Sequence, residues 1–226
     1  MFWDEENKLH GKWYEDACGG AFGMELLGER WALLIVRELM FGGRRFKDLR
    51  DGLPAVSAKV LTERLHGLEQ SDIVRRVPLP APASGQFYEL TPWGYRADQV
   101  LLPLCRWALA SPGHDHTLFL SPAAMMMSLR ALFDPEVAQG VTLSGAIEIG
   151  REAFAVGVEA GKLSVSRGAD DHGQFTIAAP TADAIKMLIH GKEPASALAG
   201  LGLAITGDEN AASRFVGLFR FPKKWG

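Results

Sequence analysis

The segment from Ser57 to Gln70 combines an apolar stripe with polar and cationic side chains on the opposite face. Leu61, Leu65 and Leu68 recur at helical spacing, which predicts a helix with these leucines on its inner face. Ser57 is suited to cap the first turn. Short polar and long cationic groups near the N-terminal end of such a helix can reach base edges in the major groove of DNA. We therefore predict contacts to DNA from Ser57, Lys59, Thr62, Glu63 and Arg64.

Basic residues are concentrated around this helix, although the whole chain is slightly acidic. The formal net charge is −3, whereas residues 30–76 contain ten Lys or Arg and six Asp or Glu, a local charge of +4. A local basic face is enough to bind a polyanion. The alternative is a solvated, charged helical hairpin that binds nothing. Further phosphate contacts are predicted at Arg44, Arg45, Lys47, Arg75 and Arg76.

The neighbouring elements give these residues a recognisable frame. Hydrophobic periodicity predicts helices over 18–27, 29–41 and 46–50, with Gly42-Gly43 as a stop. Two strands are predicted at 73–77 and 87–90, joined by a projecting loop. Thr91-Pro92 then begins a helix that reaches about residue 109. This order of helices followed by a two-stranded ribbon indicates a winged helix-turn-helix domain, mainly α-helical, over residues 1–112.

Four segments of this half resemble the HxlR-type winged helix transcriptional regulators of bacteria. Residues 26–39, 42–49 and 57–65 are similar to the family's helices, and Tyr88–Gly94 is similar to its second wing strand and following helix start. The resemblance covers about residues 13–109. It implies a DNA-binding transcriptional regulator that forms a homodimer through the first and last helices of this domain. Such a homodimer binds double-stranded DNA at a twofold-symmetric operator.

Cys18 lies where members of this family usually carry a cysteine, near the start of the first helix. In some members that thiol senses oxidants or electrophiles, and a helix N-terminus favours a thiolate. The sequence departs from the family pattern because Gly19-Gly20 follows the cysteine in place of proline. Two interpretations stay open: a thiol sensor, or a small residue packed at the dimer contact. Cys105 is interpreted as a core residue.

The chain changes character after the turn-rich segment 111–116, which predicts a second domain over residues 117–226. A helix is predicted at 121–133, followed by strands at 142–149, 152–158, 162–167 and 174–178. Helices at 180–190, 194–199 and 208–219 and a strand at 203–206 complete it. The prediction is an α+β domain with helices packed against a sheet, so that the whole chain is an α+β protein of two domains. The methionine run Met125–Met127 suits either ordinary core packing or a surface that accepts varied apolar shapes.

Three short segments of this second half, 176–185, 188–191 and 203–215, resemble the sterol-carrier-protein-like domain that follows the winged helix in some of these regulators. This resemblance covers about residues 120–222. It implies an apolar tunnel between sheet and helices and therefore a lipid or other hydrophobic effector. The alternatives are a purely structural tail, or a lipid carrier whose winged helix is vestigial. The side chains expected to line the tunnel are Met125, Met126, Leu129, Phe133, Phe154, Ile185 and Leu188.

Other classes of function find little support in the residues. The chain has no G-x-S-x-G, phosphate-loop or H-E-x-x-H motif, so we expect neither an enzyme nor a bound cofactor. The segments 114–116 and 170–172 contain metal-capable groups but are expected to be solvated loops without a metal ion. The two cysteines form no C-x-x-C pair, which suits a reducing cytoplasm. Neither a signal peptide nor an apolar run of about 18 residues is found, so no membrane insertion is expected.

Overall fold

The computed structural model describes residues 14–79, 85–169 and 172–225. The chain divides into two compact units, residues 1–101 and 102–226. The division falls inside a helix, before the turn-rich segment 111–116 where the sequence placed the domain boundary.

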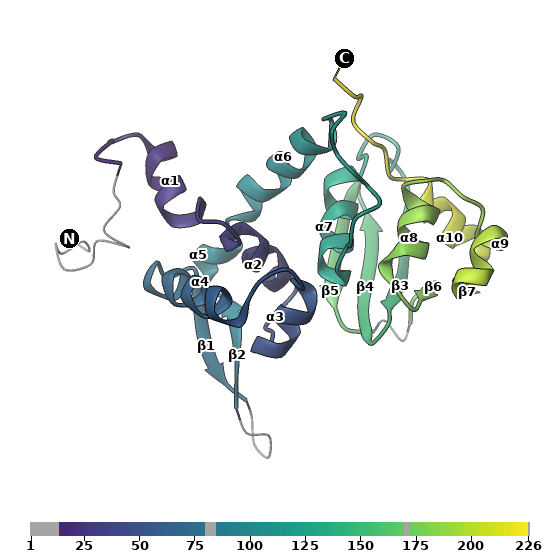
Figure 1. Ribbon diagram of the computed structural model, residues 1–226. Helices are drawn as coiled ribbons and strands as arrows, with labels where there is room; N and C mark the ends of the chain where they lie inside the picture. Colours follow the sequence, from purple (N-terminus) through teal and green to yellow (C-terminus); the bar gives the residue numbers. More distant parts are fainter. Residues whose placement is uncertain (1–13, 80–84, 170–171, 226) are drawn as a thin grey trace. The chain divides into compact units, whose positions relative to one another are not determined.

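The N-terminal unit consists of helices and a two-stranded antiparallel wing (Figure 1). The wing pairs Val74 with Leu90 and Pro78 with Gln86. Part of the loop between its strands, residues 80–84, lies outside the described residues. The elements in chain order are α1 (Gly19–Leu27), α2 (Ala32–Leu39), α3 (Phe46–Gly52), α4 (Ala58–Gln70), β1 (Val74–Pro78), β2 (Gln86–Leu90), α5 (Pro92–Tyr95) and α6 (Asp98–Leu109), in which the unit ends.

The core of this unit forms where α2, α3 and α4 meet the wing. Ile35 and Leu39 of α2 and Leu61 of α4 are completely buried, and α2 contacts both α4 and β2. The leucine stripe predicted on α4 is confirmed, because Leu65 and Leu68 are buried as well. Each such side chain contributes roughly 2 kcal/mol through removal of its apolar surface from water. These contacts fix the inner face of α4 and leave its other face exposed.

Two helix boundaries differ from the sequence prediction for local reasons. The second helix begins at Ala32 and not at residue 29, because Trp31 has a left-handed backbone with φ of 80°. The helix after Thr91 is not continuous but is divided into α5 and α6. α5 ends at Tyr95 with Arg96 as its C-cap, and α6 begins at Asp98, whose carboxylate is favourable at a helix N-terminus.

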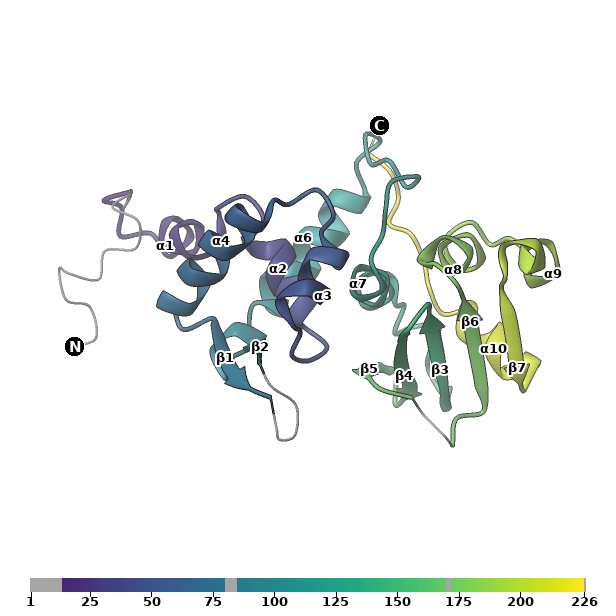
Figure 2. The same cartoon turned by 60° about the horizontal axis from the view of Figure 1, so that its bottom comes forward.

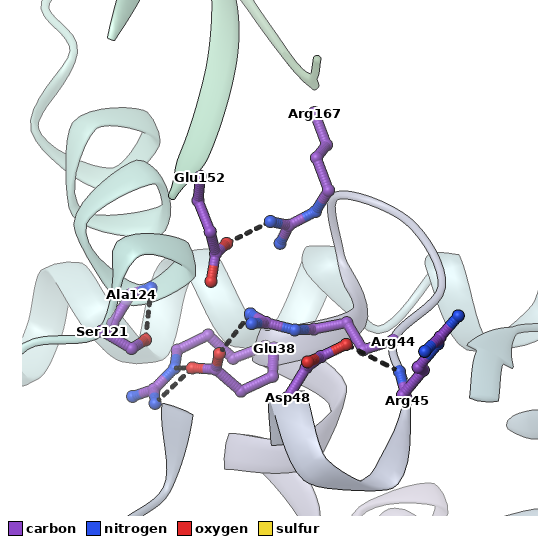
Figure 3. Close-up of polar contacts among 9 residues, drawn as sticks. Glu38, Arg44, Arg45, Asp48, Ser121, Ala124, Glu152 and Arg167 are labelled. Carbon is purple, nitrogen blue, oxygen red and sulfur yellow. Dashed lines mark hydrogen bonds and ion pairs between the residues drawn. The ribbon is translucent and has the colours of Figure 1, made fainter. Parts of the chain in front are cut away.

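A buried carboxylate holds the central elements of the N-terminal unit together (Figure 3). Glu38 of α2 is completely buried, and its Oε1 accepts a hydrogen bond from Arg37 Nη2 at 2.8 Å. Its Oε2 accepts from Arg44 Nη1 at 3.1 Å. The main chain of Arg44 in turn pairs with Tyr88 of β2 through two hydrogen bonds of 2.8 Å. A Cβ atom at Gly52 would lie 2.4 Å from Glu38 Oε2, so the end of α3 can approach the carboxylate only as glycine. The Glu38–Arg44 ion pair therefore joins α2, both ends of α3 and the wing.

The C-terminal unit is a five-stranded mixed sheet with helices (Figure 2), which confirms the predicted α+β class. The strand order is β5-β4-β3-β6-β7, with β3 parallel to β6 and the other neighbours antiparallel. Its elements are α7 (Pro122–Leu132), β3 (Leu143–Ile149), β4 (Glu152–Glu159), β5 (Lys162–Arg167), β6 (Phe175–Ala179), α8 (Ala182–Ile189), α9 (Ala195–Leu198), a 3-10 turn (Ala199–Leu201), β7 (Ala204–Gly207) and α10 (Glu209–Val216).

One face of this sheet is apolar and is covered by helices. Ile147 of β3 lies opposite Phe154 of β4 and Ile177 of β6, and all three are completely buried. α8 and α10 both contact β6, and the ring of Phe215 in α10 lies 5.3 Å from that of Phe175. The alternation of buried and more exposed residues along β4 and β6 shows why the sequence pattern predicted these strands correctly.

Because Arg44 is paired with the buried Glu38 and Arg45 is exposed, we expect substitutions of these two arginines to differ in their effect on stability. Arg44→Met leaves the Glu38 carboxylate short of one partner in the interior, so we expect the free energy of unfolding to fall by about 3 kcal/mol. Arg45→Met changes an exposed side chain and should cost less than about 0.5 kcal/mol. Urea unfolding followed by circular dichroism measures both. Equal stabilities of the two variants would show that the Glu38–Arg44 pair does not support the fold.

Candidate nucleic-acid interface

Helix α4 presents the polar face that the sequence predicted. Its first turn is capped by Ser57, whose Oγ accepts a hydrogen bond from Val60 N at 3.2 Å. Lys59, Thr62 and Glu63 are exposed, opposite the buried leucines. Thr62 Oγ1 donates to the carbonyl of Ala58 at 2.9 Å, so its hydroxyl is oriented by the helix itself. This face offers a flexible cation, a carboxylate and hydroxyl acceptors to a groove-bound ligand.

The start of α3 adds exposed cations beside a rigid turn. The main-chain N–H of Arg45 donates to Asp48 Oδ2 at 3.2 Å, which fixes the first turn of α3 (Figure 3). The Arg45 side chain is exposed. Lys47 is also exposed and pairs with Asp51 at 2.7 Å, one turn along the helix. Hydrogen bonding to Lys47 lowers the pKa of the Asp51 carboxyl.

Arg44, which the sequence predicted as a phosphate contact, is instead buried against Glu38. Its guanidinium is part of the core of the unit and is not presented on the surface. The sequence interpretation did not identify Glu38 as its partner. A signal was available, since a glutamate among the apolar residues of α2 has to be paired if it is buried.

The wing arginines are exposed, but each is held by a carboxylate of its own unit. Arg75 lies across the two strands from Glu89, with Nε donating to Glu89 Oε1 at 2.7 Å. Arg76 forms a bidentate ion pair with Glu69, in which Nε donates to Oε1 and Nη2 donates to Oε2, both at 2.6 Å. This hydrogen bonding to Glu69 raises the pKa of Arg76. The wing therefore carries oriented guanidinium groups whose charge is locally balanced.

Arg64 differs from the other cations of α4. Its Nη2 lies 3.2 Å from Glu29 Oε2, and only 21% of its side chain is exposed. It therefore points toward the connection between α1 and α2. Among residues 14–79, the exposed cations for which no ion pair is found are Arg30, Arg45, Arg50 and Lys59. Arg30 lies over the ring of Trp31, 5.2 Å from its centroid. Arg45, Arg50 and Lys59 are therefore the charges most readily available to a polyanion.

Cys18 stands immediately before α1 with an exposed side chain. Hydrogen bonding to the backbone N–H groups of Ala21 and Gly20 lowers the pKa of its thiol. The glycines that depart from the family pattern do not prevent the helix start, because α1 begins at Gly19 itself. Cys105 of α6 is half-buried. The sequence interpretation of Cys105 as a core residue therefore holds only in part, and the two thiols differ in exposure.

The residues predicted to line an apolar tunnel lie in the interior of the C-terminal unit. Phe133, which is only partly buried, packs edge-on against Phe219 at 6.3 Å. In the same unit, burial lowers the pKa of His190 to about 4, and its ring contacts Ser128 Oγ at 3.1 Å. The other six predicted residues are at most 5% exposed: Met125, Met126, Leu129, Phe154, Ile185 and Leu188.

Two further expectations concern metals and membranes. Among residues 14–79, 85–169 and 172–225, no cluster of three or more His, Cys, Asp or Glu is arranged to hold a metal ion. Asp115 of the 114–116 segment accepts two hydrogen bonds from Thr117, at 2.7 and 2.8 Å, as in a local turn. Asp170 and Asp171 lie outside the described residues. None of the helices in the described part of the chain has the length and apolar character required to span a bilayer.

Comparison with known proteins places this interface in a family. The HxlR-like helix-turn-helix family matches residues 26–114. The transcriptional regulator YodB of Bacillus subtilis is 42% identical over 83 residues, which cover 37% of this chain and 74% of YodB. The uncharacterised regulator YtfH of Escherichia coli is 31% identical over 97 residues, which cover 43% of this chain and 77% of YtfH.

A solved structure of the reduced form of YodB from B. subtilis is also similar, with 38% identity and a TM-score of 0.38. It covers 41% of this chain and 92% of YodB. The family follows from the 42% sequence identity to YodB over 74% of that protein, together with the family match over residues 26–114. This chain belongs to the HxlR-like helix-turn-helix family of transcriptional regulators.

Proposed function

We propose that the N-terminal unit binds a specific operator by placing the exposed face of α4 in the major groove of double-stranded DNA. The observation that carries the proposal is the combination on α4 of a fully buried leucine stripe and an exposed Lys59 at the capped end of the helix. Helices of this kind read bases with residues near their N-terminal end. Ser57, Thr62 and Glu63 supply the neighbouring polar groups.

Phosphate contacts complete the proposed footprint. Arg45 lies at the start of α3, where an exposed cation can meet the DNA backbone. Lys47, Arg75 and Arg76 are paired on the surface, where an ion pair contributes only about 0–1 kcal/mol and is readily exchanged for a phosphate. Arg44 is left out of the footprint because its partner is buried.

The proposed binding form is a homodimer on a twofold-symmetric operator. α1 buries none of its side chains completely, although Phe22, Met24, Leu26 and Leu27 are apolar. α6 exposes Val100, Leu104 and Trp107, which share one face of the helix. Apolar faces of this kind on separate helices are unusual in a monomer and support contact with a second copy.

Substitution of Lys59 tests the DNA-binding proposal. We expect Lys59→Ala to raise the Kd for the DNA upstream of the protein's own gene about tenfold, because a contact in the groove is lost. Fluorescence anisotropy at two salt concentrations measures this, with Lys162→Ala of β5 as a matched exposed control. Two chains per operator should bind at saturation. Equal, weak and salt-sensitive binding by all three proteins would rule out specific recognition through α4.

A second function is supported by Cys18, whose exposure and lowered pKa suit a thiol switch. We propose that reaction of this thiol with an oxidant or electrophile alters DNA binding. At pH 7 we expect Cys18, whose thiol is exposed and has a lowered pKa, to react with iodoacetamide faster than the half-buried Cys105. Mass spectrometry of the two cysteine peptides measures both rates in one sample. Cys18→Ser should keep DNA binding and lose its response to diamide; a retained response would exclude Cys18 as the switch.

For the C-terminal unit we propose a sterol-carrier-like interior that accepts an apolar effector. It is supported by a sheet with one apolar face and by Met125 and Met126, whose unbranched side chains adapt to varied shapes. A purely structural role for the unit is the competing view. An effector acts on DNA binding only if it binds one state of the protein better than the other.

Titration with a fluorescent fatty acid tests this proposal. We expect saturable binding at one site per chain, weakened several-fold by Met126→Ala, because the contact area inside the unit decreases. Met187→Ala is the matched control, since Met187 is exposed on α8. A signal that rises without saturation, or that ignores Met126→Ala, would contradict a specific interior site.

A further inference from the structure

A small cavity lies between α1, α2 and α4 in the N-terminal unit. Its volume is about 10 Å³, about the space that the centre of one water molecule needs. Glu25 and Leu26 line it from α1, Glu29 from the following connection, and Arg64 and Leu68 from α4. The cavity therefore lies behind the helix that we propose to enter DNA, on the side away from Lys59.

Two residues that line this cavity each have a buried polar atom, one a hydrogen-bond acceptor and the other a donor. Glu25 Oε1 can only accept a hydrogen bond while ionised, and Arg64 Nε can only donate one. Both atoms are buried, and neither has a hydrogen-bond partner among the described residues. Ser71, which also lines the cavity, already donates to the carbonyl of Gly67 at 2.9 Å. A single water placed between the carboxylate and the guanidinium would satisfy both groups.

Arg64 also makes a direct contact on the same side. Its Nη2 lies 3.2 Å from Glu29 Oε2. Glu29 lies in the connection to α2, in which Trp31 has a left-handed backbone. Because successive residues of a helix are rotated by about 100°, Arg64 and Lys59 point in directions about 140° apart. A side chain that faces α1 and the connection cannot at the same time face the groove that Lys59 faces.

We propose that Arg64 is a positioning residue that fixes the recognition helix α4 in two ways: directly to Glu29 of the α1–α2 connection, and through one bridging water to Glu25 of α1. Arg64 does not contact DNA. It reinforces the rotation that the buried leucines give to α4 about its own axis, and so the direction of Lys59. The consequence for DNA rests on the proposed function of α4, whereas the link between the three side chains does not. α1 begins directly after Cys18. A shift of α1 would therefore be transmitted through the same link to the recognition helix α4.

Charge exchange between Arg64 and Glu29 distinguishes a positioning residue from a phosphate contact. Arg64→Glu should lower the affinity for operator DNA at least tenfold, and adding Glu29→Arg should restore most of it. A phosphate contact would not be restored, because the glutamate would still face the DNA backbone. In the same assay, Arg64→Met should leave the salt dependence of binding unchanged, whereas loss of a phosphate contact lowers the slope by about 1. Failed rescue together with a lowered slope would overturn the proposal.

A double-mutant cycle in stability tests the link without DNA. Arg64→Met, Glu29→Gln and their combination should be non-additive by about threefold or more in the unfolding equilibrium constant. Lys59→Met combined with Glu29→Gln is the control and should be additive. Additivity in both cycles would overturn the link even if DNA binding is normal. Conversely, wild-type protein that binds DNA only non-specifically but shows the coupling would refute the proposed function of α4 and retain the link.

The bridging water has a separate readout. A crystal structure at high resolution should show one ordered water within hydrogen-bond distance of both Glu25 Oε1 and Arg64 Nε. Glu25→Leu should remove this water and keep the Arg64–Glu29 contact. Direct contact between Glu25 and Arg64, or a dry cavity in the wild-type protein, would overturn this part of the proposal.

Discussion

A carboxylate that is completely removed from water, that of Glu38, constrains several elements of the N-terminal unit at once. An ionised Glu38 in the interior is tolerated only if cations and hydrogen-bond donors surround it, and Arg37 and Arg44 provide them. Arg44 can serve only because its main chain is bound to Tyr88 of the wing. Gly52 must lack a side chain for α3 to close over the same group. The need to pair the Glu38 carboxylate thus constrains both ends of α3 and the attachment of the wing to α3. Helix α4 packs against α2 and β1 of the same unit.

The same reasoning separates cations that hold the fold from cations available to DNA. A buried pair cannot exchange its partner, because removing one member leaves a charge in the interior at a cost of about 3–5 kcal/mol. Surface pairs such as Arg76–Glu69 are worth about 0–1 kcal/mol and can exchange. The local charge of +4 therefore overstates the fixed positive field of this face. In the proposed function, recognition therefore depends on a few groups, with Lys59 foremost, and on the orientation that the core gives to α4.

The sequence predicted the order of helices and strands in both units because periodic burial, together with caps and turn residues, is a local property of the chain. The leucines of α4 and the alternating residues of β4 and β6 are examples. It placed Lys59 and Thr62 on the exposed face for the same reason. The partners of charged residues could not be obtained in this way. Arg44 and Arg64 are residues of the type that binds phosphates. Their partners Glu38 and Glu29 come close to them only through tertiary packing. The left-handed Trp31 likewise has no local signal, since tryptophan rarely adopts that conformation.

The C-terminal unit raises a different physical question, namely how a filled interior can accept a ligand. Met125, Met126 and Phe154 are completely buried, and close-packed side chains resist insertion because each added methylene has to displace a neighbour. Methionine lowers this cost, since rotation about its three side-chain bonds changes its shape without moving the backbone. Leu129 and Ile185 lack that freedom. An effector that enters here must therefore favour a repacked state, and the free energy of repacking sets how strongly its binding is able to influence the rest of the protein.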